Sequence, residues 1–383
     1  MITDAPARRS AVSVALAGLV ALAVAMGIGR FAFTPILPMM QEDAGVSIAM
    51  GGWLASANYL GYLAGALSVI WWRIGATTGI RVGLAAIGLT TLAMGLEHHV
   101  GVWLVLRALA GVASAWVLIY VSAWSLERLA SMGRPELGST VYAGVGTGIA
   151  LAGVVCLVLM YAGTSSACAW IVMGVLAVGL SLAIWTVFRA RAAASAITAE
   201  RPGAGAMAWD RESLRLVLCY GAFGFGYIIP ATFLPVMAKQ IVRDPAVFGW
   251  SWPIFGAAAM GSTLGTTVLR GLITDRRLWI VSHLVMALGV TLPILWSGIA
   301  SIMIAALLVG GTFVVITMIG MQEARSFAGA RATPLMAAMT SAFALGQIAG
   351  PVSVSLVVAA GGSMSVALAI ACVVLLVSAY ALS

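Results

Sequence analysis

The chain has 383 residues, of which 62% are hydrophobic and only 8% are charged, and its formal net charge is +8. Because soluble domains carry about 25% charged residues, this chain cannot cover a soluble fold with a polar surface, and we expect lipid to be its solvent. The basic residues stand in small groups between apolar stretches, with no basic helix or tail. The charge therefore indicates membrane topology and argues against a nucleic-acid partner.

Twelve apolar stretches in the sequence are long enough to cross a bilayer, since a spanning helix needs about 20 apolar residues. The predicted spans are 11–38, 48–72, 80–96, 101–126, 138–161, 168–188, 213–237, 247–269, 278–297, 300–321, 334–359 and 364–382. This topology places nearly all loop arginines on the side of the N-terminus and only Lys239 and Arg243 on the other side. The positive-inside rule then predicts that both termini are cytoplasmic.

An internal repeat relates the two parts of the chain at an offset of about 197 residues. GIGRFAFTPILPMM, which begins at Gly27, matches GFGYIIPATFLPVM, which begins at Gly224. The same offset aligns Trp53 with Trp250 without a gap, and it also aligns several loop arginines. Because an even number of spans separates the copies, we expect two parallel six-helix halves related by an axis along the membrane normal.

Composition predicts where the two halves are divided. The segment 189–212 is rich in Ala, Gly and charge, which is typical of a cytoplasmic linker. The predicted N-terminal half is 1–188 and the predicted C-terminal half is 213–383. The expected fold class is thus an all-α membrane protein of twelve transmembrane helices in two parallel repeats.

This architecture resembles the major facilitator superfamily (MFS) over the whole chain. RALAGVASA, with Arg107 and Gly111, resembles the superfamily's R-x-x-x-G motif, and GLITDRR, with Gly271, Asp275 and Arg276, resembles its loop motif G-x-x-x-D-R. The corresponding first-half loop, WWRIGATTGIR, lacks the Asp. The opening G-x-G-R-F-A-F-T-P-x-L-P is similar to the bacterial YbfB/YjiJ branch. The resemblance implies a bacterial inner-membrane carrier that works by alternating access, with the first, fourth, seventh and tenth helices around a central cavity.

Arg30 and Arg107 are the two charged residues expected inside spans. A charge at a helix centre costs about 2.5–3.5 kcal/mol on insertion scales, so such residues usually face a cavity or a partner. The spans hold no Asp or Glu in their cores, and two cations without counter-ions would suit an anionic substrate. The alternative is a structural or gating role. Arg107 lies in a motif shared by carriers of many substrates, which fits a structural role or one in coupling, and Arg30 could hold carbonyls exposed by Pro35 and Pro38.

Other polar residues within the spans are candidates for hydrogen bonds to a substrate. They are Asn58, Tyr59, Tyr142, Tyr227 and Gln347. Tyr227 occupies the repeat position of Arg30, so the two are expected to face one another across the cavity. A coupling proton stays open, because His98 and His99 fall in an outer loop and His283 near an inner span end. The sequence predicts no metal and no cofactor.

Charged residues at the inner ends of spans, together with the glycine of the loop motif, are candidates for conformational switching. They are Glu127, Arg128, Gly271 with Asp275 and Arg276, and Glu323 with Arg325. Their acidic and basic members stand side by side, so we expect cytoplasmic charge relays that latch the halves. Loss of Asp275 is expected to impair switching more than binding.

The expected function is secondary transport of a small solute, such as an organic anion or a drug-like compound, by efflux or uptake. The protein is expected to work as a monomer in the lipid bilayer. An intramembrane enzyme is disfavoured because the sequence has no HExxH, GxSxG or Cys/His cluster. A channel or facilitator without ion coupling stays the alternative, although the repeat with glycine-rich helices favours a carrier.

Overall fold

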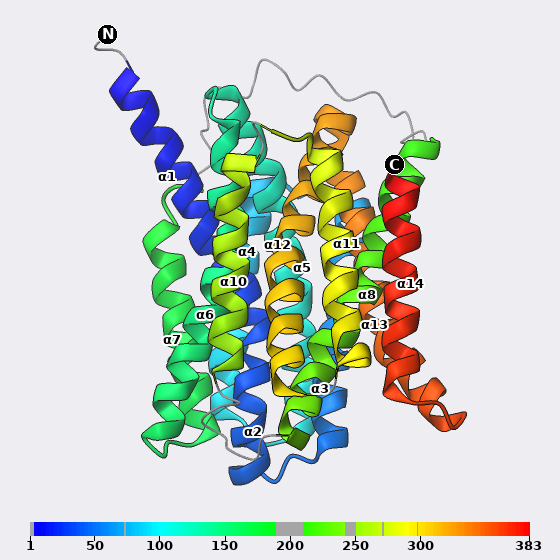
Figure 1. The fold of residues 1–383 in the computed structure, drawn as a ribbon. Helices are drawn as coiled ribbons and strands as arrows, with labels where there is room; N and C mark the ends of the chain where they lie inside the picture. Colours follow the sequence, from blue (N-terminus) through cyan, green and yellow to red (C-terminus); the bar gives the residue numbers. More distant parts are fainter. Residues whose placement is uncertain (1–3, 73, 189–209, 242–249, 270–271, 297) are drawn as a thin grey trace.

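The computed structural model describes residues 4–72, 74–188, 210–241, 250–269, 272–296 and 298–383. Long helices run side by side, and the start of the first helix and the end of the last lie at the same end of the bundle (Figure 1). We call this the terminal end and the opposite one the loop end. The first predicted span is a single helical rod with three parts. These are α1 (Asp4–Leu22), η1 (Ala23–Phe31) and α2 (Phe33–Asp43).

The other helices follow in chain order. The N-terminal half continues with α3 (Ile48–Trp71), α4 (Ala76–Leu96), α5 (Val100–Ser131), η2 (Pro135–Leu137), α6 (Gly138–Tyr161) and α7 (Ser166–Ile184). The C-terminal half contains α8 (Arg211–Ile241), α10 (Ser251–Leu269), α11 (Asp275–Leu295), α12 (Ile299–Ala328), η3 (Gly329–Arg331), α13 (Ala332–Ala359) and α14 (Met364–Leu382).

Eleven helices within the described residues are long and apolar enough to cross a membrane. The 19-residue helix α10 lies where the eighth span is predicted, so the predicted all-α fold of twelve transmembrane helices is confirmed. Several helices run beyond their apolar cores: α5 continues to Ser131 and α12 to Ala328. Helix α8 begins at Arg211, inside the segment predicted as a linker, and residues 189–209 of that segment lie outside the described part.

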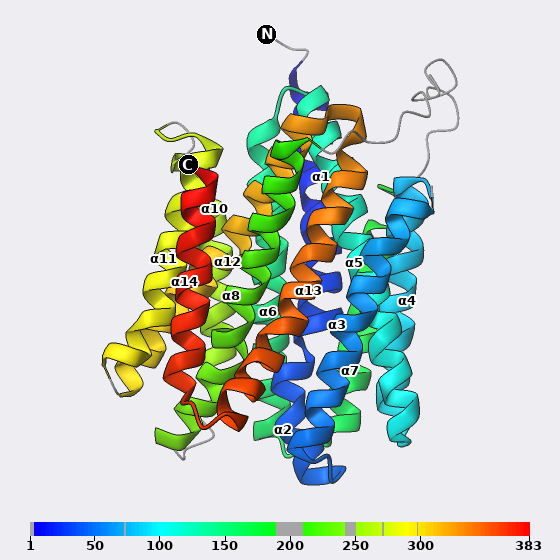
Figure 2. The same cartoon turned by 90° about the vertical axis from the view of Figure 1, so that its right-hand side faces the viewer.

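Helix packing repeats between the two halves. In the N-terminal half α3 packs on α5 and α4 packs on α7; in the C-terminal half α10 packs on α12 and α11 on α14. The two most extensive contacts between the halves are α3 with α13 and α6 with α10. Figure 2 shows the first of these, with α13 beside α3. In the repeat α3 corresponds to α10 and α6 corresponds to α13, so the two contacts between the halves are equivalent. This is the parallel two-fold arrangement that the sequence repeat predicts.

Glycines allow the closest helix contacts. A Cβ atom on Gly27 would lie 2.3 Å from the backbone of Gly148, and one on Gly111 would lie 2.1 Å from the carbonyl oxygen of Asn58. No side chain fits into either gap, so η1 packs directly on α6, and α5 packs on α3. Lipid tails provide no hydrophobic drive for helix association, and small residues that permit close packing take its place. Gly111 of the R-x-x-x-G motif therefore has a packing role.

The centre of the first rod is π-helical, a feature that hydropathy does not predict. All nine residues of η1 are buried. Just beyond it, Pro35 has no N–H to continue the helical hydrogen bonding, and Pro38 lies inside α2. A π-helical turn shifts the register of the residues that follow it, and such turns are frequent at functional sites. Arg30 lies in the last turn of this π-helical segment.

Candidate substrate site at the interface of the halves

Arg30 extends from η1 to the interface between the two halves. Its side chain is almost fully buried, with 4% exposed. Nη2 of Arg30 donates a hydrogen bond of 2.7 Å to Oε1 of Gln347, which α13 of the other half contributes. The Nε and Nη1 atoms have no hydrogen-bond partner of ordinary geometry among the described residues. No carboxylate of a described residue lies within ion-pair distance of Arg30. Arg30 therefore retains two donors for another group.

Aromatic rings of the N-terminal half surround the Arg30 guanidinium. Its carbon atom lies 3.8 Å from the ring centre of Tyr62, 5.8 Å from that of Tyr59 and 5.7 Å from that of Phe31. A ring face attracts a cation, and this interaction contributes about 2 kcal/mol or more when the pair is desolvated. Tyr62 was not among the sequence candidates, although it stands one helical turn after Asn58 and Tyr59. The rings hold the charge without neutralising it.

The C-terminal half contributes an apolar, aromatic wall at the same interface. Phe31 lies against Phe313 at 5.8 Å and Trp252 at 6.1 Å between ring centroids. Tyr227 stacks on Phe313 at 4.4 Å, and the Tyr227 hydroxyl has no hydrogen-bond partner in the described part of the chain. Tyr227 also interacts electrostatically with Arg30 and Tyr59. The site thus joins one cation from the first half to rings from the second.

Arg107 has a different environment from Arg30. Its Nη1 donates to the carbonyl oxygen of Gly29 at 3.2 Å, and its Nη2 donates to that of Arg30 at 3.4 Å. The guanidinium also packs 4.6 Å from the ring centre of Phe33. A structural role in holding exposed carbonyls was expected for Arg30. In the structure Arg107 has that role, and Arg30 does not. Arg107 supports the backbone turn that carries Arg30.

The other polar candidates lie at varying distances from this site. Asn58 is fully buried, and its Nδ2 donates to the backbone oxygen of Arg107 at 2.9 Å, which ties α3 to α5. Tyr142 of α6 interacts electrostatically with Tyr220 of α8, which in turn interacts with Arg30. Gln347 is fully buried, and its Nε2 has no partner among the residues described. Asn58 therefore supports helix packing, whereas Gln347 reaches the site itself.

Two of the switching candidates, Arg276 and Glu323, belong to an ion-pair network at the terminal end. Arg276 pairs with Glu212, which also pairs with Arg215, and Arg276 lies 3.5 Å from Glu323. Glu212 was not a sequence candidate, because its partner is far away in the sequence. Asp275 lies in the first turn of α11, where a negative charge favours the helix dipole. Gly271 lies outside the described residues.

That network lies within the C-terminal half, whereas a separate ion pair connects the two halves. Arg325 of α12 lies 3.7 Å from Glu127 of α5 between Nη1 and Oε2. Glu127 is largely exposed, so this contact is weak by itself, as surface ion pairs contribute about 0–1 kcal/mol. Arg128, its neighbour, instead packs over the ring of Trp124 at 5.7 Å.

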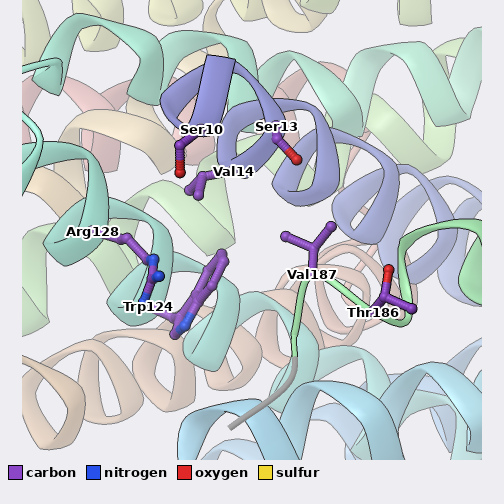
Figure 3. A pocket seen from close by; sticks show the side chains of 7 residues that line it. All are labelled: Ser10, Ser13, Val14, Trp124, Arg128, Thr186 and Val187. Atoms are coloured by element: carbon purple, nitrogen blue, oxygen red, sulfur yellow. The ribbon is translucent and has the colours of Figure 1, made fainter. Parts of the chain in front are cut away.

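Two hollows in the N-terminal half lie away from Arg30. One, of about 260 Å³, lies at the terminal end, where Arg128 and Trp124 face Ser10, Ser13 and Val14 of α1, with Thr186 and Val187 on the far side (Figure 3). The other, of about 230 Å³, includes Asp43 and Trp170 at the loop end. Arg30 and Gln347 line neither of them. Both side chains are buried and a hydrogen bond joins them across the halves, so in this conformation the two halves are closed over Arg30.

Two parallel six-helix halves with a buried polar centre at their interface define a transporter of the major facilitator type. Residues 22–383 match the family described as "Uncharacterised MFS-type transporter YbfB", and the chain belongs to this family. The superfamily and branch predicted from the sequence motifs are thereby confirmed.

Two individual proteins illustrate the relationship. The chain is 32% identical over 97 residues to "Uncharacterized MFS-type transporter YceJ" of Bacillus subtilis (strain 168), and the match spans 24% of each chain. The fold is similar to the crystal structure of the human organic anion transporter MFSD10 (TETRAN), with a TM-score of 0.73 and 14% sequence identity. That match covers 99% of this chain and 100% of the other. At this identity, the likeness shows the fold alone.

Proposed function

We propose that this protein is a secondary transporter that moves a small organic anion with one carboxylate across the bacterial inner membrane by alternating access. The observation that carries the proposal is the state of Arg30. It is a buried cation between the halves, and its Nε and Nη1 remain unbonded within the described residues. A carboxylate accepts two parallel N–H bonds from one edge of a guanidinium, which gives both strength and orientation. Both such edges include Nη2, so a carboxylate at Arg30 would bond to Nε or Nη1 together with Nη2, which in this structure donates to Gln347.

The environment of Arg107 limits the charge of the substrate. Its two Nη atoms donate to backbone carbonyls, so of its nitrogens only Nε has no partner among the described residues. Arg107 keeps its positive charge, but a second carboxylate or a phosphate dianion would have to break these carbonyl bonds to gain a pair of N–H donors, and a buried anion without such donors is costly. We therefore infer a monoanion.

The rings around Arg30 indicate the rest of the substrate. Phe31, Phe313 and Tyr227 form an apolar surface next to the guanidinium. Flat apolar groups pack well against such rings, and aromatic contacts contribute about 0.5–1.5 kcal/mol beyond the area they bury. An aromatic or otherwise apolar carboxylate, including drug-like acids, fits this environment. The structural neighbour MFSD10 is an organic anion transporter, which agrees with this proposal.

Transport would require the halves to separate first on one side of Arg30 and then on the other. The Glu127–Arg325 pair would open when the terminal end opens, while the network around Arg276 would keep α8, α11 and α12 together. The loop arginines gather mainly at the terminal end, so we assign this end to the cytoplasm.

A thermal-shift screen of the purified protein tests the proposal. The panel pairs each monocarboxylate with its neutral amide, for example benzoate with benzamide, and adds dicarboxylates of matched size. We expect one or more monocarboxylates to raise the melting temperature, their amides to have no effect, and Arg30→Gln to abolish the shift. Arg134→Gln serves as the control, because Arg134 is a partly exposed arginine paired with Glu136. Equal stabilisation by acids and amides, or a full shift in Arg30→Gln, would contradict the proposal.

A further inference from the structure

The contact between Arg30 and Gln347 raises the question of how an empty carrier can close. The two residues are 317 positions apart and belong to opposite halves, and their hydrogen bond of 2.7 Å is buried. Among the described residues, it is the one hydrogen bond of ordinary geometry that the Arg30 side chain donates, and Arg30 also interacts with the Tyr62 hydroxyl. The two halves are closed over a cation although no carboxylate of the described residues is near it.

Closure over an unpaired cation is unfavourable, because burial removes the water that solvates the charge. Two features reduce that cost here. The rings of Tyr62, Tyr59 and Phe31 attract the guanidinium, and they belong to the same half as Arg30, so they stay with it in every conformation. The Gln347 oxygen comes from the other half, so its hydrogen bond forms only when the halves meet. Gln347 therefore makes the hydrogen bond to Arg30 that favours closure.

We infer that Gln347 takes the place of the substrate's carboxylate in the empty carrier, so that the halves can close over Arg30 without cargo. The inference rests on the proposed function, because it assigns the carboxylate of a substrate to Arg30. An amide oxygen accepts the same N–H bond that a carboxylate oxygen accepts, but it carries no charge and is more easily displaced.

A glutamine suits both the empty and the loaded carrier. In the empty carrier its Oε1 accepts from Arg30, while its Nε2 has no partner among the described residues. When a carboxylate occupies Arg30, rotation of the amide would direct the Nε2–H bonds to the carboxylate instead. The same side chain would then close the empty site and contact the loaded one. A carrier that closes without cargo can return empty, so this arrangement supports net transport and not only exchange of one anion for another.

The experiment measures closure of the empty protein. Distances between spin labels are recorded in a cysteine-free background, since Cys156, Cys168, Cys219 and Cys372 are free thiols. One label pair, Ser131→Cys with Ser326→Cys, reports on the terminal end; the other, Glu42→Cys with Ser363→Cys, reports on the loop end, and all four positions are exposed. The protein is full-length, and the buffer contains chloride but no organic acid.

Three variants of α13 distinguish the outcomes. We expect Gln347→Leu to lower the ratio of closed to open protein by about tenfold or more, because a hydrogen bond to a charged group is lost. We expect Gln347→Glu to increase the closed fraction, since a carboxylate would pair with Arg30 permanently. Ser341→Ala is the control; Ser341 is also buried on α13, but its hydroxyl bonds to Ala337 of its own helix.

Two results would overturn the inference: distance distributions in Gln347→Leu that equal those of the parent, or a more open protein in Gln347→Glu. The second variant keeps the test decisive if the first folds poorly. Because no organic anion is present, the measurement is independent of the carboxylate screen. If no monocarboxylate stabilises the protein but the label distances change as expected, the proposed substrate class is wrong and the role of Gln347 in closure still holds.

Discussion

Arg107 donates a hydrogen bond of 3.4 Å to the backbone oxygen of Arg30, and thus one intramembrane arginine supports the other. The backbone at this point is the end of a π-helix, where the regular helical hydrogen bonds are interrupted. A second bond, to the oxygen of Gly29, fixes the neighbouring peptide. The two arginines therefore have separate roles, and substitutions should separate them.

Loss of Arg107 should reduce stability. In Arg107→Leu the carbonyls of Gly29 and Arg30 lose their side-chain donors inside the membrane, and an unsatisfied buried group costs about 1–3 kcal/mol. We expect a lower melting temperature in detergent and weaker anion binding, because the turn that presents Arg30 relaxes. Arg30→Leu is the comparison, and its melting temperature should change less or even rise, since a buried charge disappears. The reverse order of the two melting temperatures would count against separate roles.

Charge alone at position 30 should not suffice for binding. Arg30→Lys keeps a cation but loses the planar pair of N–H donors and the flat contact with the Tyr62 ring. We expect it to weaken binding of a monocarboxylate by about tenfold or more, in line with the strength of hydrogen bonds to charged groups. Isothermal titration of the variant and the parent checks this. Parent-like affinity in Arg30→Lys would show that simple charge attraction explains binding.

The packing role of Gly111 should be visible in stability. A methyl group at this position would lie 2.1 Å from the Asn58 oxygen, so Gly111→Ala must push α3 away from α5. Overpacking typically costs about 1–3 kcal/mol, and the Asn58–Arg107 contact would be strained as well. Gly52→Ala is a matched control in α3, because no atom lies within 4 Å of its added carbon. If Gly111→Ala and Gly52→Ala lower the melting temperature equally, Gly111 does not have this packing role.

The contact between Glu127 and Arg325 should affect switching more than binding. We expect Glu127→Arg to slow transport, because two like charges would face each other when the terminal ends meet. The double variant Glu127→Arg with Arg325→Glu should restore the rate, while substrate affinity stays constant throughout. Initial rates of uptake into proteoliposomes, together with equilibrium binding, check both points. No rescue by the double variant would mean that the pair does not join the halves during transport.

Some features could be predicted from the sequence because they depend on local composition or on register. Hydropathy indicated the twelve spans, and the match of Gly27 with Gly224 indicated two parallel halves, which the pairing of α3–α13 and α6–α10 bears out. The predicted ends were less accurate at α5 and α12, because these helices continue into their charged ends. Hydropathy measures the apolar core of a helix and not its length.

The direction of a side chain was harder to predict. The residue types made both arginines candidate ligands of an anion, but only the packed helices show that Arg30 bonds to the other half whereas Arg107 bonds to the backbone of its own half. Gln347 lies 317 residues from Arg30, and Glu212 lies 64 residues from Arg276. Neither could be assigned as a partner from its spacing in the sequence. Only the arrangement of the helices brings these residues together.

The proposed function depends most on Arg30 as the binding site of a carboxylate, and equilibrium binding tests this most directly. A radiolabelled monocarboxylate that stabilises the parent protein would be titrated against the parent, Arg30→Gln and the control Arg134→Gln. We expect binding to the parent and to Arg134→Gln with the same affinity, and a loss of at least about tenfold in Arg30→Gln. Unchanged affinity in Arg30→Gln would contradict this role of Arg30, because the anion would then bind elsewhere in the protein.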